Sequence, residues 1–244
     1  FLIFLLLPVA GQVYVSMRTW QLLPAVPALR IAAVVVMALA FVAFFVAMSG
    51  VVNHWPMGLA RVTYEVGTSW LIILLYLFLA FLLLDVMRLC RVVQSAALHE
   101  NGRLAAGLAI TLVALFTYAY YHYNDKKRVE MTITTTKDIG KDLKLVLVSD
   151  LHLGYHNTRG DLHRWIAMLK AENPDAILIG GDIIDGSYRP VEEENMAAEF
   201  RALHIPVFAC LGNHDYYTGI SADMKFCREA GIRVLRDEAA SFDK

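Results

Sequence analysis

Four stretches without any Asp, Glu, Lys or Arg occupy most of the first half of this 244-residue chain. Each is close to the about 20 apolar residues that an α-helix needs to cross a bilayer. Buried helices of a soluble domain would carry polar faces, and these stretches have almost none. We therefore predict a membrane region over residues 1–123 with four transmembrane helices, at about residues 1–17, 31–48, 66–84 and 104–121.

The first of these stretches admits one alternative, the apolar core of a signal peptide. A signal peptide has a basic start and a small-residue cleavage site before a soluble domain, and residues 1–17 show neither. Pro8 lies inside the stretch and is tolerated where neighbouring helices compensate for its lost hydrogen bond. Because the chain begins at Phe1 and runs straight into apolar residues, we expect that it lacks its natural start.

In the second half, three short apolar runs each end in a polar string. The runs at 144–148, 176–179 and 206–211 are typical of strands buried on both faces, and 232–235 predicts another strand. The three strings are Ser149-Asp150-Leu151-His152, Gly180-Gly181-Asp182 and Gly212-Asn213-His214-Asp215. They recur about every 30 residues, the length of one βαβ unit. Parallel strands would therefore bring all three strings to one edge of a sheet.

The segments between the runs have the pattern of crossover helices. Residues 158–171 and 191–203 carry apolar side chains at helical spacing. A third helix is predicted over 221–230, with Ser221 as its N-cap and Gly231 just past its end. Residues 124–143 form a connector with an edge strand at 129–135, and residues 144–244 form an α/β domain.

The polar strings contain the residue types of a two-metal site. A carboxylate can bridge two divalent cations about 3.5–4 Å apart, which together activate water and neutralise phosphoryl charge. Asp182, flanked by glycines, is the candidate bridge. Asp150 and His152, two apart on an extended segment, point the same way and can bind one metal. Asn213 offers an amide oxygen to the other metal.

The remaining two residues of the third string are the predicted catalytic pair. His214 would face the substrate and stabilise or protonate the departing oxygen, and Asp215 would orient its ring. The purely structural alternative is that Asp150, Asp182 and Asn213 only cap turns after strands. The order and regular spacing of the three strings disfavour it. His156, four positions after His152, is more often a solvated loop residue than a ligand.

The strings SDLHLG, GGD and GNHD, in this order and at this spacing, resemble the calcineurin-like metallophosphoesterase superfamily, and the apolar region resembles its bacterial membrane-bound members. The resemblance implies a partial two-sheet sandwich flanked by helices, with Asp150 and His152 on one metal, Asp182 as the bridge and Asn213 on the other. It also implies that His214 acts at the transition state, supported by Asp215. The two divalent ions could be Mn, Fe or Zn.

The sequence departs from this family after Asp215. The family completes its site with a further histidine and a Gly-His-x-His segment, and no histidine follows Asp215 here. We therefore expect that the chain is a C-terminally truncated piece of a longer protein. Its metal site would then be incomplete.

The fold class is thus a multi-helix membrane region followed by an α/β metallophosphoesterase domain. The leading function is a membrane-anchored phosphoesterase that hydrolyses a phosphomonoester or phosphodiester, with a lipid or envelope-derived substrate because the domain lies near the bilayer. The alternative is a membrane sensor or transport component whose phosphoesterase-like domain is a degenerate binding module. The two hypotheses differ in whether the missing segment contains the remaining metal-binding histidines: the degenerate module would lack them.

The charge and the cysteines of the chain indicate neither nucleic-acid binding nor a disulfide or zinc site. With 22 basic and 23 acidic residues, the chain has no field that favours nucleic acid. Cys90, Cys210 and Cys227 are isolated and give neither a disulfide framework nor zinc-ligand spacing.

Basic residues near the predicted spans indicate the orientation. The first and third connections between spans hold five basic residues: Arg18, Arg30, Arg88, Arg91 and Arg103. The second connection and the exit from the fourth span hold four: Arg61, Lys126, Lys127 and Arg128. Because cytoplasmic loops are enriched in Lys and Arg, this margin of one favours a catalytic domain outside the cytoplasm. The family resemblance favours the same side.

Overall fold

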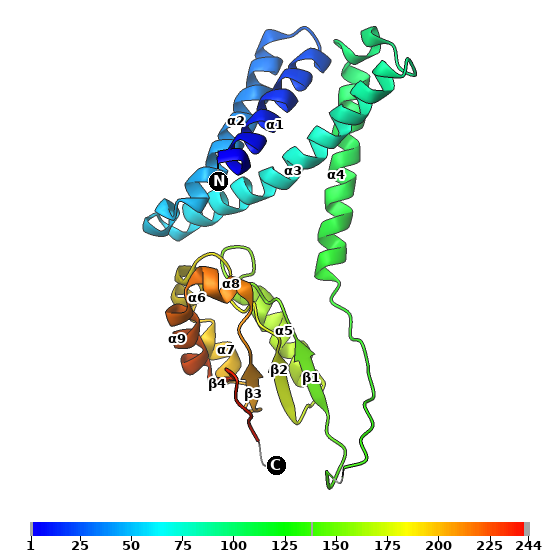
Figure 1. Ribbon diagram of the computed structural model, residues 1–244. Coiled ribbons are helices and arrows are strands. Elements are labelled where there is room, and N and C mark those ends of the chain that lie inside the picture. Colours follow the sequence, from blue (N-terminus) through cyan, green and yellow to red (C-terminus); the bar gives the residue numbers. More distant parts are fainter. Residues whose placement is uncertain (1, 138, 242–244) are drawn as a thin grey trace. The chain divides into compact units, whose positions relative to one another are not determined.

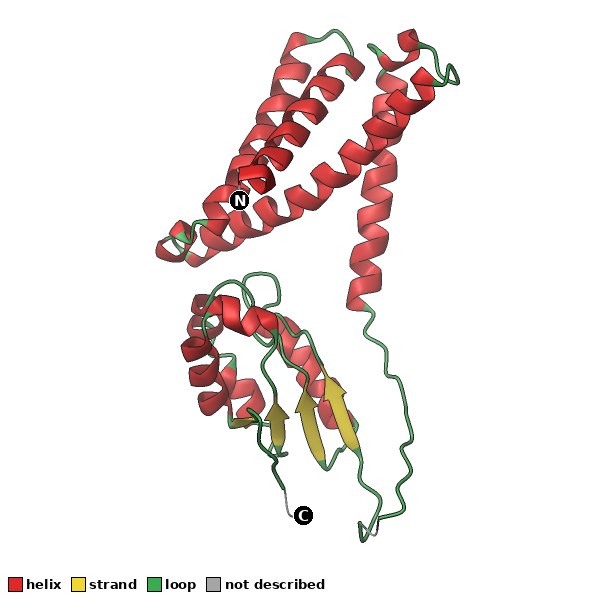
Figure 2. Ribbon diagram, in the orientation of Figure 1, coloured by secondary structure: helices red, strands yellow, loops and turns green. Residues whose placement is uncertain are grey.

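The computed structural model describes residues 2–137 and 139–241, and the side chains of residues 6–137 and 139–241. The chain divides into two compact units. The first holds the residues up to Val51 together with Val62–Thr134, and the second holds Val52–Arg61 together with the described residues from Thr135 onward. The first is helical and the second combines strands and helices (Figures 1 and 2).

Long helices dominate the first half of the chain. They are α1 (Leu2–Leu22), α2 (Pro27–Met48), α3 (Met57–Leu89) and α4 (Gly102–Asn124), with short 3₁₀ helices at Val51–His54 and Ser95–Leu98. Among the described residues, α2, α3 and α4 are long and apolar enough to cross a membrane. The predicted spans at 31–48, 66–84 and 104–121 fall inside these three helices. The first predicted span, 1–17, lies within α1 from Leu2 onward, while Phe1 is outside the described residues. That α1 crosses a membrane stays a prediction.

Polar contacts join α1 to α3. Arg18 Nη2 lies 2.6 Å from Asp85 Oδ1, and the Tyr14 hydroxyl donates to Asp85 Oδ2 at 2.6 Å. Trp70 Nε1 donates to Gln12 Oε1 at 2.9 Å. Charges removed from water are costly unless paired, so these contacts allow polar side chains between two otherwise apolar helices.

A parallel sheet organises the second unit. Its strands, in spatial order, are β1 (Leu145–Val148), β2 (Ala176–Ile179), β3 (Val207–Ala209) and β4 (Ile232–Val234). Leu145 lies opposite Ala176, and Ile177 opposite Val207. The four strands predicted for the α/β domain are confirmed. The spatial order of the strands is the same as their order in the chain. Each crossover connection therefore leads to the neighbouring strand of the sheet.

Among the described residues, the helices that follow β1 in the chain accompany the sheet. They are α5 (Arg159–Ala171), α6 (Tyr188–Glu193), α7 (Ala197–Arg201), α8 (Asn213–Thr218) and α9 (Ile220–Ala230). The core between helices and sheet includes Ile177, Ile179, Val207 and Ala209, whose positions alternate along β2 and β3. Alternate residues of a strand share one face, so the helices bury one face of the sheet.

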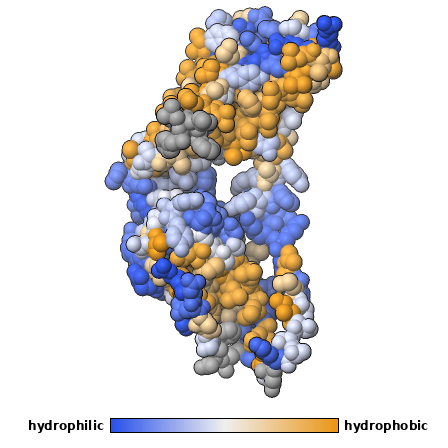
Figure 3. Space-filling view, in the orientation of Figure 1, coloured by the Kyte–Doolittle hydropathy of each residue, from blue (hydrophilic) through white to orange (hydrophobic). Residues whose placement is uncertain are grey.

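The other face of the sheet is open at β1. Leu147 is 69% exposed and Leu145 48% exposed, and Figure 3 shows apolar surface where the strands lie in Figure 1. The prediction that all three runs are buried on both faces is therefore wrong for β1. Within the described residues the unit has one sheet, so the two-sheet sandwich is present only in part.

Three local predictions need correction. The helix expected over 191–203 is divided into α6 and α7, and Asn195 between them has a left-handed φ of 51°. Gly219, with φ 109°, is the N-cap of α9, so Ser221 lies in the first turn. Residues 129–135 form no strand: they are exposed, and none of the strands in the described part of the chain pairs with them.

A capping box begins α5. Thr158 precedes α5, and its backbone N–H donates to Asp161 Oδ2 at 2.9 Å. The acidic residue in the first turn thus satisfies a backbone donor and favours the positive end of the helix dipole.

Candidate metal centre

The polar strings lie at the carboxyl ends of β1, β2 and β3, as predicted. Three of their residues have left-handed backbone conformations: Asp150 (φ 57°), His152 (φ 44°) and Asp182 (φ 53°). Such conformations are uncommon outside glycine and are typically retained at functional sites. The expectation that Asp150 and His152 lie on an extended segment is therefore wrong, because both turn sharply just after β1.

The turns bring imidazole and carboxylate groups together. One ligand atom from each of His152, Asp182 and His214 lies within 4.8 Å of the others. Asp150 Oδ1 is 3.6 Å from His152 Nε2, so Asp150 borders the same cluster. Two atoms bound to one transition metal at about 2.1 Å each are at most about 4.2 Å apart. The described side chains thus fit a divalent cation after only small shifts.

Two glycines allow the strings to approach this closely. Gly181 has φ 95°, and a Cβ there would lie 2.6 Å from the Gly212 nitrogen. A Cβ at Gly212 would lie 2.2 Å from Asp182 Oδ1. A side chain at either position would push the second and third strings apart, which explains the glycine at each one.

The ring of His214 pairs with Asp185. His214 Nδ1 lies 2.8 Å from Asp185 Oδ1, and a carboxylate can only accept, so Nδ1 carries the proton. The prediction that Asp215 orients this ring is wrong. Sequence reasoning missed Asp185, although it stands three positions after Asp182 in the same Gly-Gly-Asp-Ile-Ile-Asp string.

Asp215 instead holds the backbone of the second string. It is fully buried, and its carboxylate accepts the N–H groups of Asp182 at 2.9 Å, Ile183 at 2.8 Å and Gly212 at 2.8 Å. The N–H of Ile184 is more distant, at 3.4 Å. A buried carboxylate needs such donors, and here they fix the turn that carries Asp182.

The other predicted residues occupy the rim. Asn213 is the first residue of α8 and is exposed, beside His214, whose N–H donates to Asp182 Oδ1 at 2.8 Å. The assignment of Asn213 as a metal ligand stays a prediction. His156 is exposed in the turn after β1.

A second acid is buried behind the site. Asp223 of α9 is 1% exposed, and burial, followed by the negative charge of Asp215, raises its pKa to about 8. The carboxyl group therefore keeps its proton in the folded protein at neutral pH.

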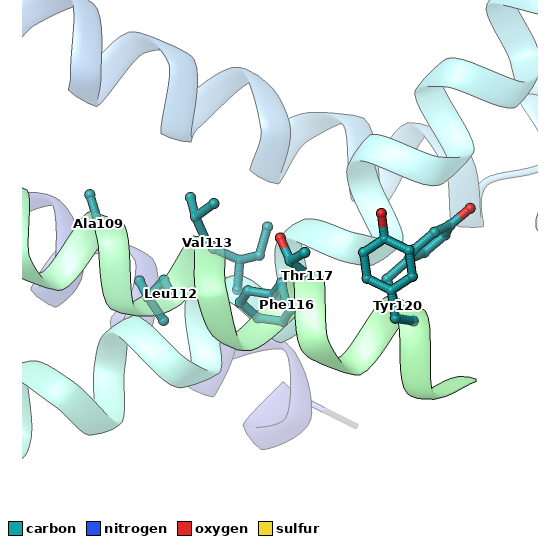
Figure 4. A pocket seen from close by; sticks show the side chains of 8 residues that line it. Ala109, Leu112, Val113, Phe116, Thr117 and Tyr120 are labelled. Atoms are coloured by element: carbon teal, nitrogen blue, oxygen red, sulfur yellow. The ribbon is translucent and has the colours of Figure 1, made fainter. Parts of the chain in front are cut away.

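A hollow in the first unit has a different character. It measures about 620 Å³. Figure 4 shows the side chains that line it, most of which are hydrocarbon. Its lining comprises Ile73, Ala109, Leu112, Val113, Phe116, Thr117, Tyr120 and Tyr121. Because none of these offers a carboxylate or imidazole, the hollow cannot supply a comparable ligand set.

Comparisons with known proteins agree with the class that this geometry defines, an α/β domain with a His/Asp cluster at the carboxyl edge of a parallel sheet. Residues 143–239 match the model of the calcineurin-like phosphoesterases. This part of the chain belongs to that superfamily.

Three relatives illustrate its range. An uncharacterized metallophosphoesterase of Aquifex aeolicus is 32% identical over 136 residues, covering 54% of this chain and 51% of that protein. A transmembrane protein with metallophosphoesterase domain from Danio rerio is 29% identical, covering 46% and 26%. The UDP-2,3-diacylglucosamine pyrophosphatase LpxG of Chlamydia trachomatis is 35% identical, covering 34% and 25%. The chain thus spans about half or less of these relatives.

The buried acid leads to a testable pH dependence. The folded protein keeps the Asp223 proton up to a pH of about 8, whereas an unfolded chain loses it near pH 4. The contribution of Asp223 to stability is therefore fully present below about pH 4 and is lost as the pH rises through about 8. Asp223→Asn removes this dependence.

We expect the melting temperature of Asp223→Asn, relative to the unaltered protein, to be higher at about pH 9 than at about pH 5. Thermal denaturation at both pH values measures this. An equal difference at the two values would contradict the buried, protonated state.

Proposed function

We propose that this protein is a membrane-anchored, divalent-metal-dependent phosphoesterase that hydrolyses a phosphomonoester or phosphodiester. The observation that carries the proposal is the meeting of His152, Asp182 and His214 from three separate loops, with ligand atoms within 4.8 Å. The superfamily match over 143–239 supports the reaction class. Three helices long and apolar enough to cross a membrane support the anchor.

The proposed metal ligands are those of the three strings. Asp150 and His152 would hold one cation, Asp182 would bridge, and Asn213 would hold the second. When bound, the cations supply an activated water and neutralise charge on the phosphoryl group. Carboxylate, amide and imidazole donors suit Mn, Fe or Zn.

His214 provides the proton chemistry in this proposal. Its Nδ1 hydrogen bond to Asp185 fixes the orientation of the ring, and Nε2 is then the atom that would donate a proton to the departing oxygen. Asp215 acts indirectly, through the backbone of the turn that carries Asp182.

The proposed substrate is a phosphate ester of a lipid or envelope component. The apolar helices would keep the domain close to a bilayer, where such esters are concentrated. The relative LpxG is named a UDP-2,3-diacylglucosamine pyrophosphatase, and that name refers to an acylated substrate that contains phosphate. Hydrolysis of lipid-linked diphosphates, compared with a soluble aryl phosphodiester, tests this part of the proposal, and equal preference for soluble esters would contradict it.

Asp182→Asn tests the reaction itself. Replacing the bridging carboxylate with an amide should lower Mn²⁺-dependent hydrolysis of an aryl phosphodiester by the full-length protein at least about 100-fold, because one donor atom and one charge are lost. Asp142→Asn, an exposed change outside the site, is the matched control and should retain full activity. Persistent hydrolysis by Asp182→Asn would reject the assignment.

Asp185→Asn tests the positioning of His214. Loss of the carboxylate should lower kcat by about 10–100-fold while Mn²⁺ affinity, measured by calorimetry, stays unchanged. A normal kcat would show that the His214 ring needs no acidic partner, and a large loss of Mn²⁺ affinity would instead make Asp185 part of the metal site.

The orientation proposal places the catalytic domain outside the cytoplasm, on the basis of the basic residues flanking the spans. A cysteine introduced at Asp142, in a variant without the three native cysteines, should react with a membrane-impermeant thiol reagent in intact cells. Labelling only after lysis would place the domain in the cytoplasm.

A further inference from the structure

A segment that comprises most of the link from α2 to α3 and the first residues of α3 forms part of the second unit. Val52–Arg61 belongs to the same compact body as the sheet, although more than 70 residues of the first unit separate it from β1 in the chain. Val52 and Ala60 are buried. The Val52 carbonyl oxygen accepts from Arg189 Nη1 at 3.2 Å, and Arg61 forms an ion pair with Glu194. Both ends of the segment are thus held by residues of this unit.

Asn53 within this segment links two loops of the metal centre. Its Oδ1 accepts hydrogen bonds from the Tyr155 hydroxyl at 2.8 Å and from Ser187 Oγ at 2.9 Å. Tyr155 follows His152 by three residues, and Ser187 follows Asp185 by two. One amide oxygen therefore joins the loop of the first string to the loop of the second.

The two loops also rest directly on each other, so a shift in one is transmitted to the other. Leu153 N donates to Ile183 O at 2.8 Å, and Asp185 N donates to Leu153 O at 3.0 Å. A Cβ at Gly154 would lie 2.7 Å from the Asp185 carbonyl oxygen, so the two backbones are too close at this point for any side chain.

These loops also carry the strain of the site. His152 and Asp182 are held in left-handed conformations that unstrained non-glycine residues avoid. Such conformations persist only where surrounding contacts over-determine them. Asn53 is well placed to supply part of that restraint, because it fastens both loops just beyond their strained residues.

We propose that Asn53 is a positioning residue of the metal centre, which holds the His152 loop and the Asp185 loop at the separation that metal binding requires. This inference rests on the proposed function. A purely structural alternative is that Asn53 only satisfies the buried Tyr155 hydroxyl, which would affect stability but not the site.

The test compares three variants of the full-length protein in detergent. Asn53→Leu removes the acceptor, and Asn53→Asp keeps an oxygen that can accept from both hydroxyls. His54→Leu is the matched control, since His54 is the exposed neighbour in the same short helix. The measurements are Mn²⁺ affinity, kcat and KM on an aryl phosphodiester, and amide hydrogen exchange without metal.

Asn53→Leu should weaken Mn²⁺ binding by about tenfold and lower kcat more than it raises KM. Without metal, it should speed amide exchange in Leu153–Tyr155 and Asp185–Ser187. Asn53→Asp should restore all three properties, and His54→Leu should match the unaltered protein. Exchange and Mn²⁺ affinity unchanged in Asn53→Leu would overturn the inference, as would a lowered melting temperature with normal Mn²⁺ affinity and kcat.

The two proposals fail in distinguishable ways. An unaltered protein that neither binds Mn²⁺ nor hydrolyses the ester would reject the proposed function. The exchange measurement would still decide whether Asn53 fastens the two loops, because it requires no metal.

Discussion

The carboxylate of Asp215 lies fully buried where the loops after β2 and β3 meet, and it accepts the N–H groups of Asp182, Ile183 and Gly212. These donors belong to two different polar strings, so a single anion fixes the position of one string against the other. Without it, three backbone N–H groups and a tight glycine contact would have no common partner in the core. The His/Asp cluster depends on this interaction, because Asp182 and His214 belong to the two strings that it joins.

The cluster is built on strained turns. Asp150, His152 and Asp182 have left-handed φ values at the ends of strands whose register is fixed by parallel pairing. A rigid sheet supplies the positions of the turns, and buried hydrogen bonds hold the unfavourable conformations. Such a site can present a carboxylate and two imidazoles to one small region without help from a flexible loop.

Much of this arrangement could be predicted from the chain alone. The strands follow from their branched apolar residues, and β2 was predicted at its observed bounds, 176–179. The order and spacing of the polar strings placed Asp150, Asp182 and His214 at one edge of the sheet. The open face of β1 escaped prediction because Leu145 and Leu147 have the same composition as buried strand residues, and only neighbouring elements decide their exposure. The break at Asn195 also escaped, because buried apolar residues such as Val191 and Met196 lie on both sides of it in the chain.

The sequence by itself determined the apolar helices, the parallel strands and the metal-binding residue types, since these follow from local composition, periodicity and spacing. Only the tertiary structure decided which carboxylate forms hydrogen bonds with which groups. Asp215 is adjacent to His214 in the chain, yet its side chain lies in the core, while Asp185 from another loop reaches the ring at 2.8 Å. It likewise decided that Asn53, distant in the chain, fastens two loops of the site. These pairings join residues far apart in sequence, and local patterns carry no information about contacts that exist only after the chain has folded.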